Sequence, residues 1–217
     1  MKIVLYGATG KAGSRILTEL LGRGHEVVAM VRNPDKLAAK DGLTVEQGDL
    51  SRVEAIAKAI GGAQAVVSAY APPPDKTGEL IDVTERQIAA VQRVSQQANS
   101  TEHAPRLIVV GGAASLEGAP GVTLVSAKDF PAAWKPIALA HEKALELLRA
   151  SSIDWTYLSP SVFFEPGQRT GKFRLGQDQL LTATDGKSWI SMEDYAIALV
   201  DELEQPQHRR QRFTVGY

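Results

Sequence analysis

The chain has 217 residues, with 24 basic and 25 acidic side chains, a formal net charge of -1 at pH 7, and no cysteine. This length suits one domain, the balanced charge argues against nucleic acid and membrane surfaces as partners, and the missing cysteine excludes disulfides and cysteine-ligated metals. No apolar run approaches the roughly 20 residues that span a bilayer, and the four histidines lack metal-site spacing, so we expect a cytoplasmic protein without a catalytic metal.

The chain opens with an apolar strand over residues 2–6, a glycine-rich turn, and an amphipathic helix that ends near residue 21. The turn contains Gly7, Gly10 and Gly13 in the spacing G-x-x-G-x-x-G. This spacing permits a sharp bend, close approach of backbone to a diphosphate, and tight packing of helix on strand. The helix would point its unpaired N–H groups at that diphosphate. We therefore predict a nucleotide site here, with Thr9, Lys11 and Ala12 as further turn residues.

The next segments alternate between strands and helices. Strands are predicted at residues 26–31, 43–47, 65–69 and 106–110, because these runs are short and largely apolar. A helix is expected after Ser51, which would cap it together with Glu54, and a long helix over residues 79–97. Such alternation is typical of a parallel sheet with right-handed crossovers.

The second half continues the pattern after a segment without periodicity. Residues 113–136 are rich in Gly, Pro, Ala and Ser, which suggests a functional loop over the carboxyl edge of the sheet. A helix over 135–149, a strand over 154–158, a helix opening at Ser191 and a strand over 212–215 follow. We predict a single α/β domain, a doubly wound parallel sheet of the Rossmann type, with a small C-terminal lobe at roughly 160–217 that contributes to a substrate pocket.

Small and polar residues follow several of the predicted strands. In doubly wound sheets, ligands lie outside the carboxyl ends of the strands, near the point where the strand order reverses. The convergence of such residues at these ends predicts a nucleotide-binding domain. The residues concerned, beyond the opening turn, are Arg32, Asp49, Leu50, Ser68, Ala69, Tyr70, Gly111 and Gly112.

The residue that ends the second strand bears on the choice of cofactor. An acid there would accept hydrogen bonds from the adenosine ribose, whereas an arginine pairs with a 2'-phosphate. The chain has Arg32, and Lys11 would add a second positive charge. The sequence therefore favours NADP(H), with NAD(H) as the second choice, although both side chains have the alternative of being ordinary solvated cations.

The third and fourth strand ends suggest contacts with the adenosine. Asp49 is placed to hydrogen-bond the adenine amino group and Leu50 to cover the ring. The alternative for Asp49 is an acid stabilised by the helix dipole, and the two roles are compatible. Ser68 and Ala69 would pass beneath the nucleotide, and Tyr70 would contact it or simply cover the proline loop.

Together these segments resemble the atypical short-chain dehydrogenase/reductase superfamily, in particular the NmrA-like branch with its small NADH-flavin-reductase-like proteins related to flavin/biliverdin reductase. The resemblance covers nearly the whole chain. It rests on G-A-T-G-K-A-G at 7–13, R-N-P at 32–34, G-D-L at 48–50, V-V-G-G-A at 109–113 and D-W-T-Y-L-S-P-S at 154–161. It implies a monomer or homodimer that binds NADP(H) and reduces a flavin, quinone or similar small planar electron acceptor, with Pro160, Ser161 and Phe163 meeting the nicotinamide.

The chain departs from the superfamily at its usual Tyr-x-x-x-Lys pair. Lys143 falls at the lysine position, where the resemblance implies a ribose contact, but Leu139 stands where the tyrosine would be. Without that phenol, reduction of a simple ketone lacks its proton donor. Hydride transfer to a conjugated ring requires mainly orientation, so the departure favours an aromatic acceptor.

Three residues are candidates for catalysis: Ser115, His141 and Lys143. Ser115 has the alternative of a plain loop serine, and His141 that of a surface residue. His141 and Lys143 are two apart on one helix, so they cannot point the same way. Phe163, Phe164 and Trp134 would form an apolar wall for a planar acceptor, unless they serve ordinary packing.

The leading hypothesis is an NADPH-dependent reductase of a flavin, quinone or comparable acceptor. The main alternative is an NmrA-like redox sensor that holds NADP(H) without turnover. A sugar-nucleotide epimerase or dehydratase ranks last, because the tyrosine is missing and the C-terminal region is short.

Overall fold

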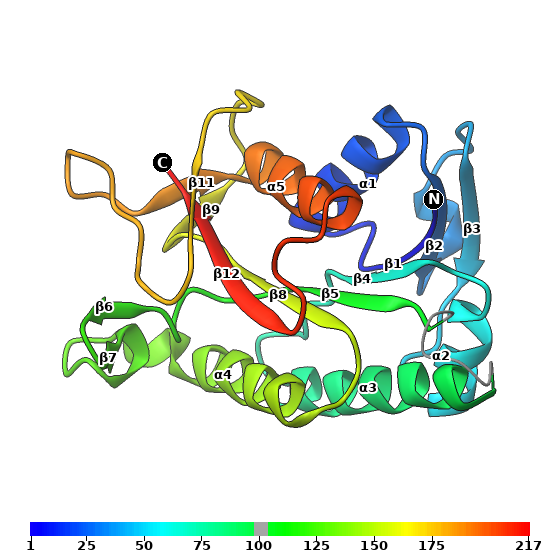
Figure 1. Ribbon diagram of the computed structural model, residues 1–217, viewed down its shortest axis with the longest axis horizontal. Coiled ribbons are helices and arrows are strands. Elements are labelled where there is room, and N and C mark those ends of the chain that lie inside the picture. Colours follow the sequence, from blue (N-terminus) through cyan, green and yellow to red (C-terminus); the bar gives the residue numbers. More distant parts are fainter. Residues whose placement is uncertain (98–103) are drawn as a thin grey trace.

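The computed structural model describes residues 1–97 and 104–217. Its centre is an eight-stranded sheet in which only the edge pair β10 and β12 is antiparallel. The strands are β1 (Lys2–Tyr6), β2 (Glu26–Val31), β3 (Leu43–Gln47), β4 (Ala65–Ser68), β5 (Arg106–Val110), β8 (Trp155–Ser159), β10 (Arg174–Gly176) and β12 (Gln211–Gly216). Their order is β10-β12-β8-β5-β4-β1-β2-β3 (Figure 1). The strand order therefore reverses between β1 and β4, which confirms the doubly wound fold.

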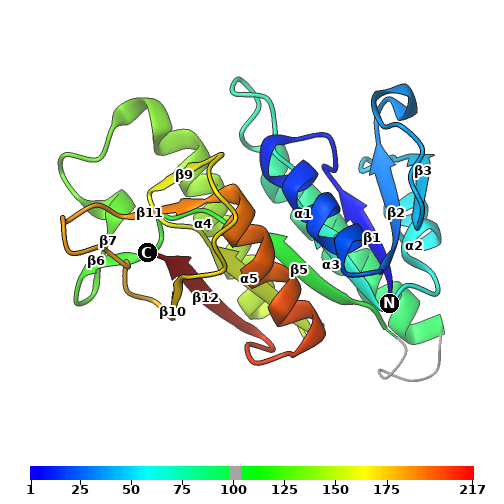
Figure 2. The same ribbon diagram turned by 90° about the horizontal axis from the view of Figure 1, so that it is seen from above.

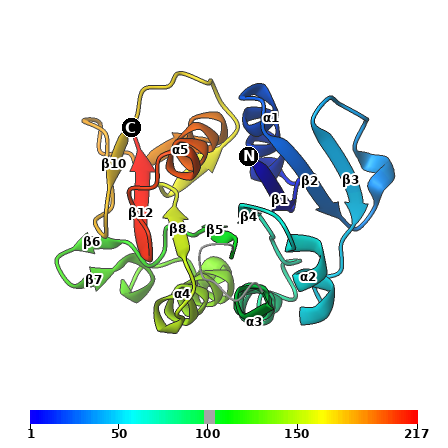
Figure 3. The ribbon, with the colours of Figure 1, turned by 45° about the vertical axis from the view of Figure 1, so that its right-hand side comes forward.

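Helices cover both faces of this sheet. One face carries α1 (Lys11–Gly22) and α5 (Met192–Glu204), and the other carries α2 (Val53–Ile60), α3 (Glu79–Gln97) and α4 (Lys135–Ala150) (Figures 2 and 3). Within the described residues, none of these helices is both long and apolar enough to cross a membrane.

The first strand shows why its sequence is apolar at nearly every position. Ile3 and Leu5 pack in the cluster with α1 and α5, whereas Val4 and Tyr6 pack in the cluster with α2 and α3. All four side chains are buried, because successive side chains of a strand point to opposite faces and both faces are covered.

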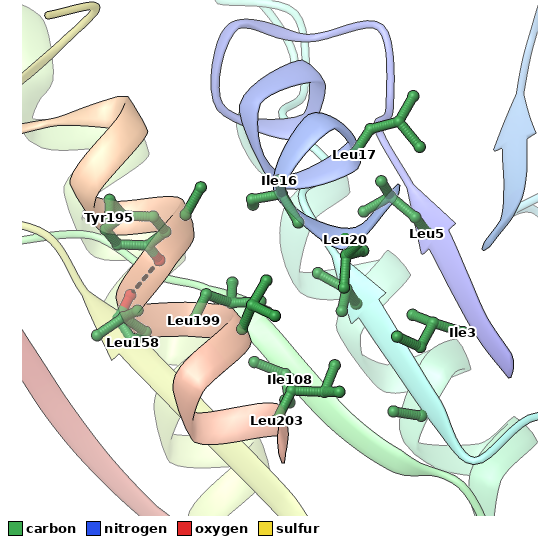
Figure 4. Packing of buried hydrophobic residues seen from close by; sticks show 14 of the residues in the cluster. Ile3, Leu5, Ile16, Leu17, Leu20, Ile108, Leu158, Tyr195, Leu199 and Leu203 are labelled. Atoms are coloured by element: carbon green, nitrogen blue, oxygen red, sulfur yellow. Dashed lines mark hydrogen bonds between the residues drawn. The ribbon is translucent and has the colours of Figure 1, made fainter. Parts of the chain in front are cut away.

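The α1/α5 face is held by apolar packing and by buried hydrogen bonds between α5 and the sheet. Ile16 and Leu20 of α1 pack with Leu199 of α5 over the sheet (Figure 4). The hydroxyl of Tyr195 donates to the carbonyl oxygen of Leu158 at 2.7 Å, which ties α5 to β8. Tyr195 is itself fully buried.

The expected cap of the second helix is wrong. Helix α2 begins at Val53 with Arg52 as its N-cap, and that cap makes no side-chain hydrogen bond. Ser51 instead donates from its backbone N and its hydroxyl to Oδ1 of Asp49, at 2.8 and 2.6 Å. The carboxylate of Asp49 is the stronger local acceptor, so the segment forms an Asx turn rather than a capping box.

The segments expected to be a loop and a lobe contain more regular structure than the sequence indicates. Residues 113–136 include a hairpin of β6 (Glu117–Ala119) and β7 (Val122–Thr123), and 3-10 turns at Leu124–Ser126 and Ala132–Trp134. Beyond residue 160, α5 and β12 belong to the central layers, while β9 (Phe163–Glu165) and β11 (Trp189–Ser191) form a separate two-stranded sheet. Residues 160–217 thus contribute to both the central layers and the small sheet.

We predict that Leu20→Ala lowers the free energy of unfolding by about 2–5 kcal/mol, because it deletes a fully buried side chain between α1, the sheet and α5. Urea denaturation followed by circular dichroism measures the change. Thr18→Ala, at an exposed position of the same helix, is the control and should change it by about 0.5 kcal/mol or less. Equal losses in both variants would contradict this account of the core.

Candidate nucleotide-binding site

The opening turn is too tight for side chains at two of its glycines. Gly7 has a φ of 81°, in the left-handed region, and a Cβ added there would lie 2.2 Å from the carbonyl oxygen of Ala69. A Cβ on Gly13 would lie 2.0 Å from the carbonyl oxygen of Gly7. The first glycine therefore lets β1 and the end of β4 approach, and the third lets α1 pack on the turn.

The turn leads directly into the N-terminus of α1. Its N-cap is Gly10, which has no side chain to offer to the N–H groups of the first helical turn. The backbone N of Gly10 itself is bound to the carbonyl oxygen of Gly7 at 2.9 Å. A helix start without a side-chain cap presents its N–H groups to an anion.

A cleft of about 920 Å³ adjoins this turn at the carboxyl ends of β1, β2, β3 and β4 and extends to α3. Its volume is within the range of small-molecule sites. Eight of the predicted cofactor residues line it: Gly7, Thr9, Gly10, Arg32, Asp49, Leu50, Ala69 and Tyr70. The rest of the lining is formed by Tyr6, Met30, Val31, Gln47, Gly48, Ser51, Ala71, Glu79, Asp82, Val83 and Arg86.

The cleft carries two guanidinium groups in different settings. Arg32 is exposed at the rim, after the last residue of β2. Arg86 of α3 is engaged with the protein, since one nitrogen donates to the carbonyl oxygen of Leu50 at 3.4 Å and another lies 3.9 Å from Asp82. Of the two, Arg32 is therefore the group more available to an added phosphate.

Asp49 is held as a carboxylate. The hydroxyl and backbone N–H of Ser51 and the guanidinium of Arg52 lower the pKa of its side chain to about 2. Nε of Arg52 lies 3.0 Å from Oδ2. The carboxylate thus orders the turn after β3, and the predicted contact with adenine would use its remaining acceptor capacity.

Tyr6 lines the cleft at the end of β1, and its side chain carries an unpartnered polar atom that is buried beneath the surface. Its side chain is buried, and its hydroxyl has no hydrogen-bond partner within residues 1–97 and 104–217. Burial, followed by the charges of Asp49 and Glu46, raises the pKa of the phenol, so it stays protonated. Buried hydroxyls without partners are uncommon and costly.

Tyr70 lies at the end of β4 and reaches α3. Its hydroxyl donates to Oε2 of Glu79 at 2.9 Å, and burial together with that carboxylate raises the pKa of the phenol to about 12. The ring thus lines the cleft while its polar end is fixed to the first turn of α3.

The glycines after β5 have a packing role that the sequence did not indicate. A Cβ on Gly111 would lie 2.2 Å from Cε1 of Tyr157, and one on Gly112 would lie 3.0 Å from Cγ of His141. The backbone N of Gly112 donates to the hydroxyl of Tyr157 at 3.0 Å. Both positions must be small so that β5 can end against these two rings.

His141 and Lys143 do point in different directions, as their spacing predicts. The imidazole of His141 lies against Gly112 and Tyr157, and burial lowers its pKa to about 4. The alternative of a surface histidine is therefore wrong. Lys143 is exposed, with Nζ 2.8 Å from Oε2 of Glu146, and it does not line the cleft.

Ser115 is buried and faces a charged pair rather than the cleft. Its hydroxyl accepts a hydrogen bond from Nη1 of Arg212 at 3.3 Å, and Arg212 is also paired with Asp178. A role of Ser115 toward substrate would require this contact to open.

The residues expected at the nicotinamide end lie apart from the cleft. Ser161 is buried and its hydroxyl donates to the carbonyl oxygen of Val215 at 3.0 Å. Phe163 is 51% exposed and Trp134 is 56% exposed, whereas Phe164 packs on Tyr195 with ring centroids 4.6 Å apart. The cleft lining also omits Lys11, Ala12, Gly13, Ser68, Gly111, Gly112 and Pro160.

Sequence reasoning missed the contribution of α3. Glu79, Asp82, Val83 and Arg86 line the cleft from the first two turns of this helix. Their spacing of three, four and seven residues marks one helical face. That spacing was the available signal, but the orientation of the face depends on how the helix packs.

We predict that Gly13→Ala destabilises the protein by about 1–3 kcal/mol or more, because the added methyl would overlap the backbone of Gly7. Gly22→Ala is a matched control on the same helix, since no atom lies within 4 Å of a Cβ at that position. Thermal unfolding compares the two variants. A Gly13→Ala protein as stable as the Gly22→Ala protein would contradict the observed turn.

The lowered pKa of His141 predicts a pH-dependent stability. Between about pH 6.5 and about pH 4 the unfolded chain binds a proton that the folded chain does not, so stability falls as the pH falls through this window. From pH 7.5 to pH 5, the wild type should lose about 1–2 kcal/mol more than a His141→Gln variant in urea denaturation. Parallel losses in the two proteins would show that His141 titrates normally.

The sequence matches a family of known proteins and a relative over nearly its whole length. The sequence profile described as NAD(P)H-binding matches residues 7–206. An uncharacterised protein of Bacillus subtilis, YwnB, is 40% identical over 99% of this chain and 98% of its own length.

The chain is also similar to solved structures, and the following two are among those that match over 100% of it. A protein of Streptococcus pneumoniae provisionally named an NADH-flavin reductase is 34% identical, with 99% of it covered and a TM-score of 0.87. A provisionally named epimerase of Bacteroides thetaiotaomicron is 41% identical, with 96% of it covered and a TM-score of 0.90. With its glycine turn and adjoining cleft, this chain belongs to the NAD(P)H-binding family of Rossmann-fold proteins.

Proposed function

We propose that the chain is an NADPH-dependent reductase that transfers hydride to a flavin or a comparable conjugated acceptor. The observation that carries this proposal is the exposed guanidinium of Arg32 at the rim of the cleft beside the glycine turn. NAD(P)H binding follows from the family, whereas the preference for the 2'-phosphate and the identity of the acceptor are proposals.

Different residues around the cleft would bind different parts of the cofactor. The first-turn N–H groups of α1 would bind the diphosphate, and Arg32 would bind the 2'-phosphate. Leu50 and Asp49 would contact the base, and Tyr6 would line the cleft beneath it. When bound, the reduced nicotinamide supplies the hydride.

The side chains around α4 favour an acceptor that needs no strong acid. Leu139, at the position of the superfamily tyrosine, is 46% exposed and carries no proton to give. His141 is neutral near pH 7, because burial lowers its pKa. A conjugated ring spreads the added charge and takes its proton from water, so orientation is the main requirement on the protein. The name of the Streptococcus pneumoniae relative is consistent with a flavin.

We predict that Arg32→Ala weakens NADPH binding by about 10-fold to 100-fold, the effect of losing a charge-assisted hydrogen bond, and leaves NADH binding nearly unchanged. Isothermal titration calorimetry measures both affinities. Lys36→Ala is the control, since Lys36 is an exposed cation nearby that does not line the cleft. Equal losses for the two cofactors would defeat the assignment of Arg32.

The activity itself is tested by mixing the protein with NADPH and either FMN, riboflavin or simple quinones, and following the loss of nicotinamide absorbance. We expect turnover with at least one of these acceptors. Tight binding of NADPH with no turnover across the panel would favour the sensor instead.

A further inference from the structure

Three groups meet in one hydrogen-bonded array where β5 ends. The hydroxyl of Tyr157 lies 3.1 Å from Nδ1 of His141, 3.2 Å from the carbonyl oxygen of His141 and 3.0 Å from the backbone N of Gly112. Tyr157 is fully buried, and the two rings meet edge to face at 75°. The array is thus fixed by packing on every side of the phenol.

One placement of the hydrogen atoms satisfies all three contacts of the phenol. A phenol donates one hydrogen bond, and the backbone N–H of Gly112 can only donate. If the phenol donates to the carbonyl oxygen of His141, then Nδ1 of His141 must carry the hydrogen that it shares with the phenol oxygen. This assignment satisfies all three contacts at once. The nearby charge of Arg212, which favours negative charge on the phenol oxygen, supports its role as a double acceptor.

The assignment leaves Nε2 of His141 as an unprotonated nitrogen with a lone pair. Within the described part of the chain, no residue hydrogen-bonds Nε2, and this atom is not among the fully buried ones that lack a partner. It therefore keeps access to solvent beside Gly112, at the carboxyl edge of the sheet. A lone pair there attracts a hydrogen-bond donor and repels a carbonyl oxygen.

We propose that Tyr157 is a positioning residue that holds His141 in its Nδ1–H form, so that Nε2 accepts a hydrogen bond from a ring N–H of the electron acceptor. This inference rests on the proposed function and narrows its substrate class. An isoalloxazine ring has such an N–H group, whereas a simple quinone has only carbonyl oxygens. A site built for a donor discriminates against compounds that leave its acceptor unpaired.

The reaction balances without proton transfer by these two side chains. The hydride, one proton with two electrons, breaks its bond to C4 of the nicotinamide and forms a bond to the acceptor ring, so the nicotinamide is oxidised and the acceptor reduced. The second proton comes from water. His141 and Tyr157 stay neutral throughout and serve to orient the acceptor, since a neutral imidazole is a poor acid.

The tautomer is tested without any turnover. Two-bond proton–nitrogen NMR spectra of 15N-histidine-labelled protein distinguish protonated from unprotonated ring nitrogens, and His141→Gln assigns the signals. We expect Nδ1 protonated and Nε2 unprotonated in the wild type, with a shift toward Nε2–H in Tyr157→Phe. Tyr195→Phe removes another buried hydroxyl, which donates to the carbonyl oxygen of Leu158, and should leave the signals unchanged. A wild-type protein with protonated Nε2 overturns the proposal.

The selection for an N–H group is tested with lumiflavin and its N3-methyl derivative, which lacks the donor. Fluorescence titration of the NADPH-free wild-type protein should give tighter binding of lumiflavin by about 3-fold to 10-fold, the effect of one neutral hydrogen bond. His141→Phe should bind both flavins alike while its affinity for NADPH is unchanged. Equal binding of the two flavins by the wild type overturns the selection even if the variant fails to fold.

These outcomes are separable from those of the proposed function. If NADPH is not oxidised with any acceptor, the reductase proposal fails, whereas the NMR signals and the ratio of flavin affinities still decide the roles of Tyr157 and His141.

Discussion

The site depends on one constraint, the close approach of three backbone segments at the first turn. The carbonyl of Gly7 occupies the space where a Cβ of Gly13 would lie. The carbonyl of Ala69 likewise occupies the space where a Cβ of Gly7 would lie. These two contacts seat the N-terminus of α1 over the ends of β1 and β4, where the strand order reverses. The cleft lies beside this point and is lined by the carboxyl ends of β1, β2, β3 and β4 and by α3. Anything that separated these segments would remove both the anion-binding helix end and the floor of the cleft.

Under the proposed function, the two ends of the bound cofactor meet different kinds of protein surface. Around the adenosine end, charged groups are arranged at the rim, with Arg32 exposed and Asp49 held ionised by Ser51 and Arg52. Around the end of β5, Tyr157 and His141 occupy the room that Gly111 and Gly112 leave, and burial keeps both rings neutral near pH 7. The charged groups of the cleft therefore lie at its rim, whereas two neutral rings lie at the end of β5.

Most of the fold could be predicted from the sequence, because it depends on local signals: apolar runs, glycine spacing and alternation of strand with helix. The strands and helices of the first half begin and end within a few residues of their expected limits. The orientation of side chains on helices could not be predicted in the same way. Lys143 was assigned to a ribose contact by its position in a motif, but the packing of α4 turns that position outward and His141 inward. Ser115 and the cleft-facing side of α3 show the same limit, since tertiary packing determines which face a helix or loop presents.

The measurement that tests the central claim most directly is a crystal structure of the chain with NADPH. We expect the diphosphate at the N–H groups that begin α1, the 2'-phosphate within hydrogen-bond distance of the guanidinium of Arg32, and the base in the cleft over Tyr6. A cofactor bound elsewhere, or one whose 2'-phosphate points away from Arg32 into solvent, would contradict the account.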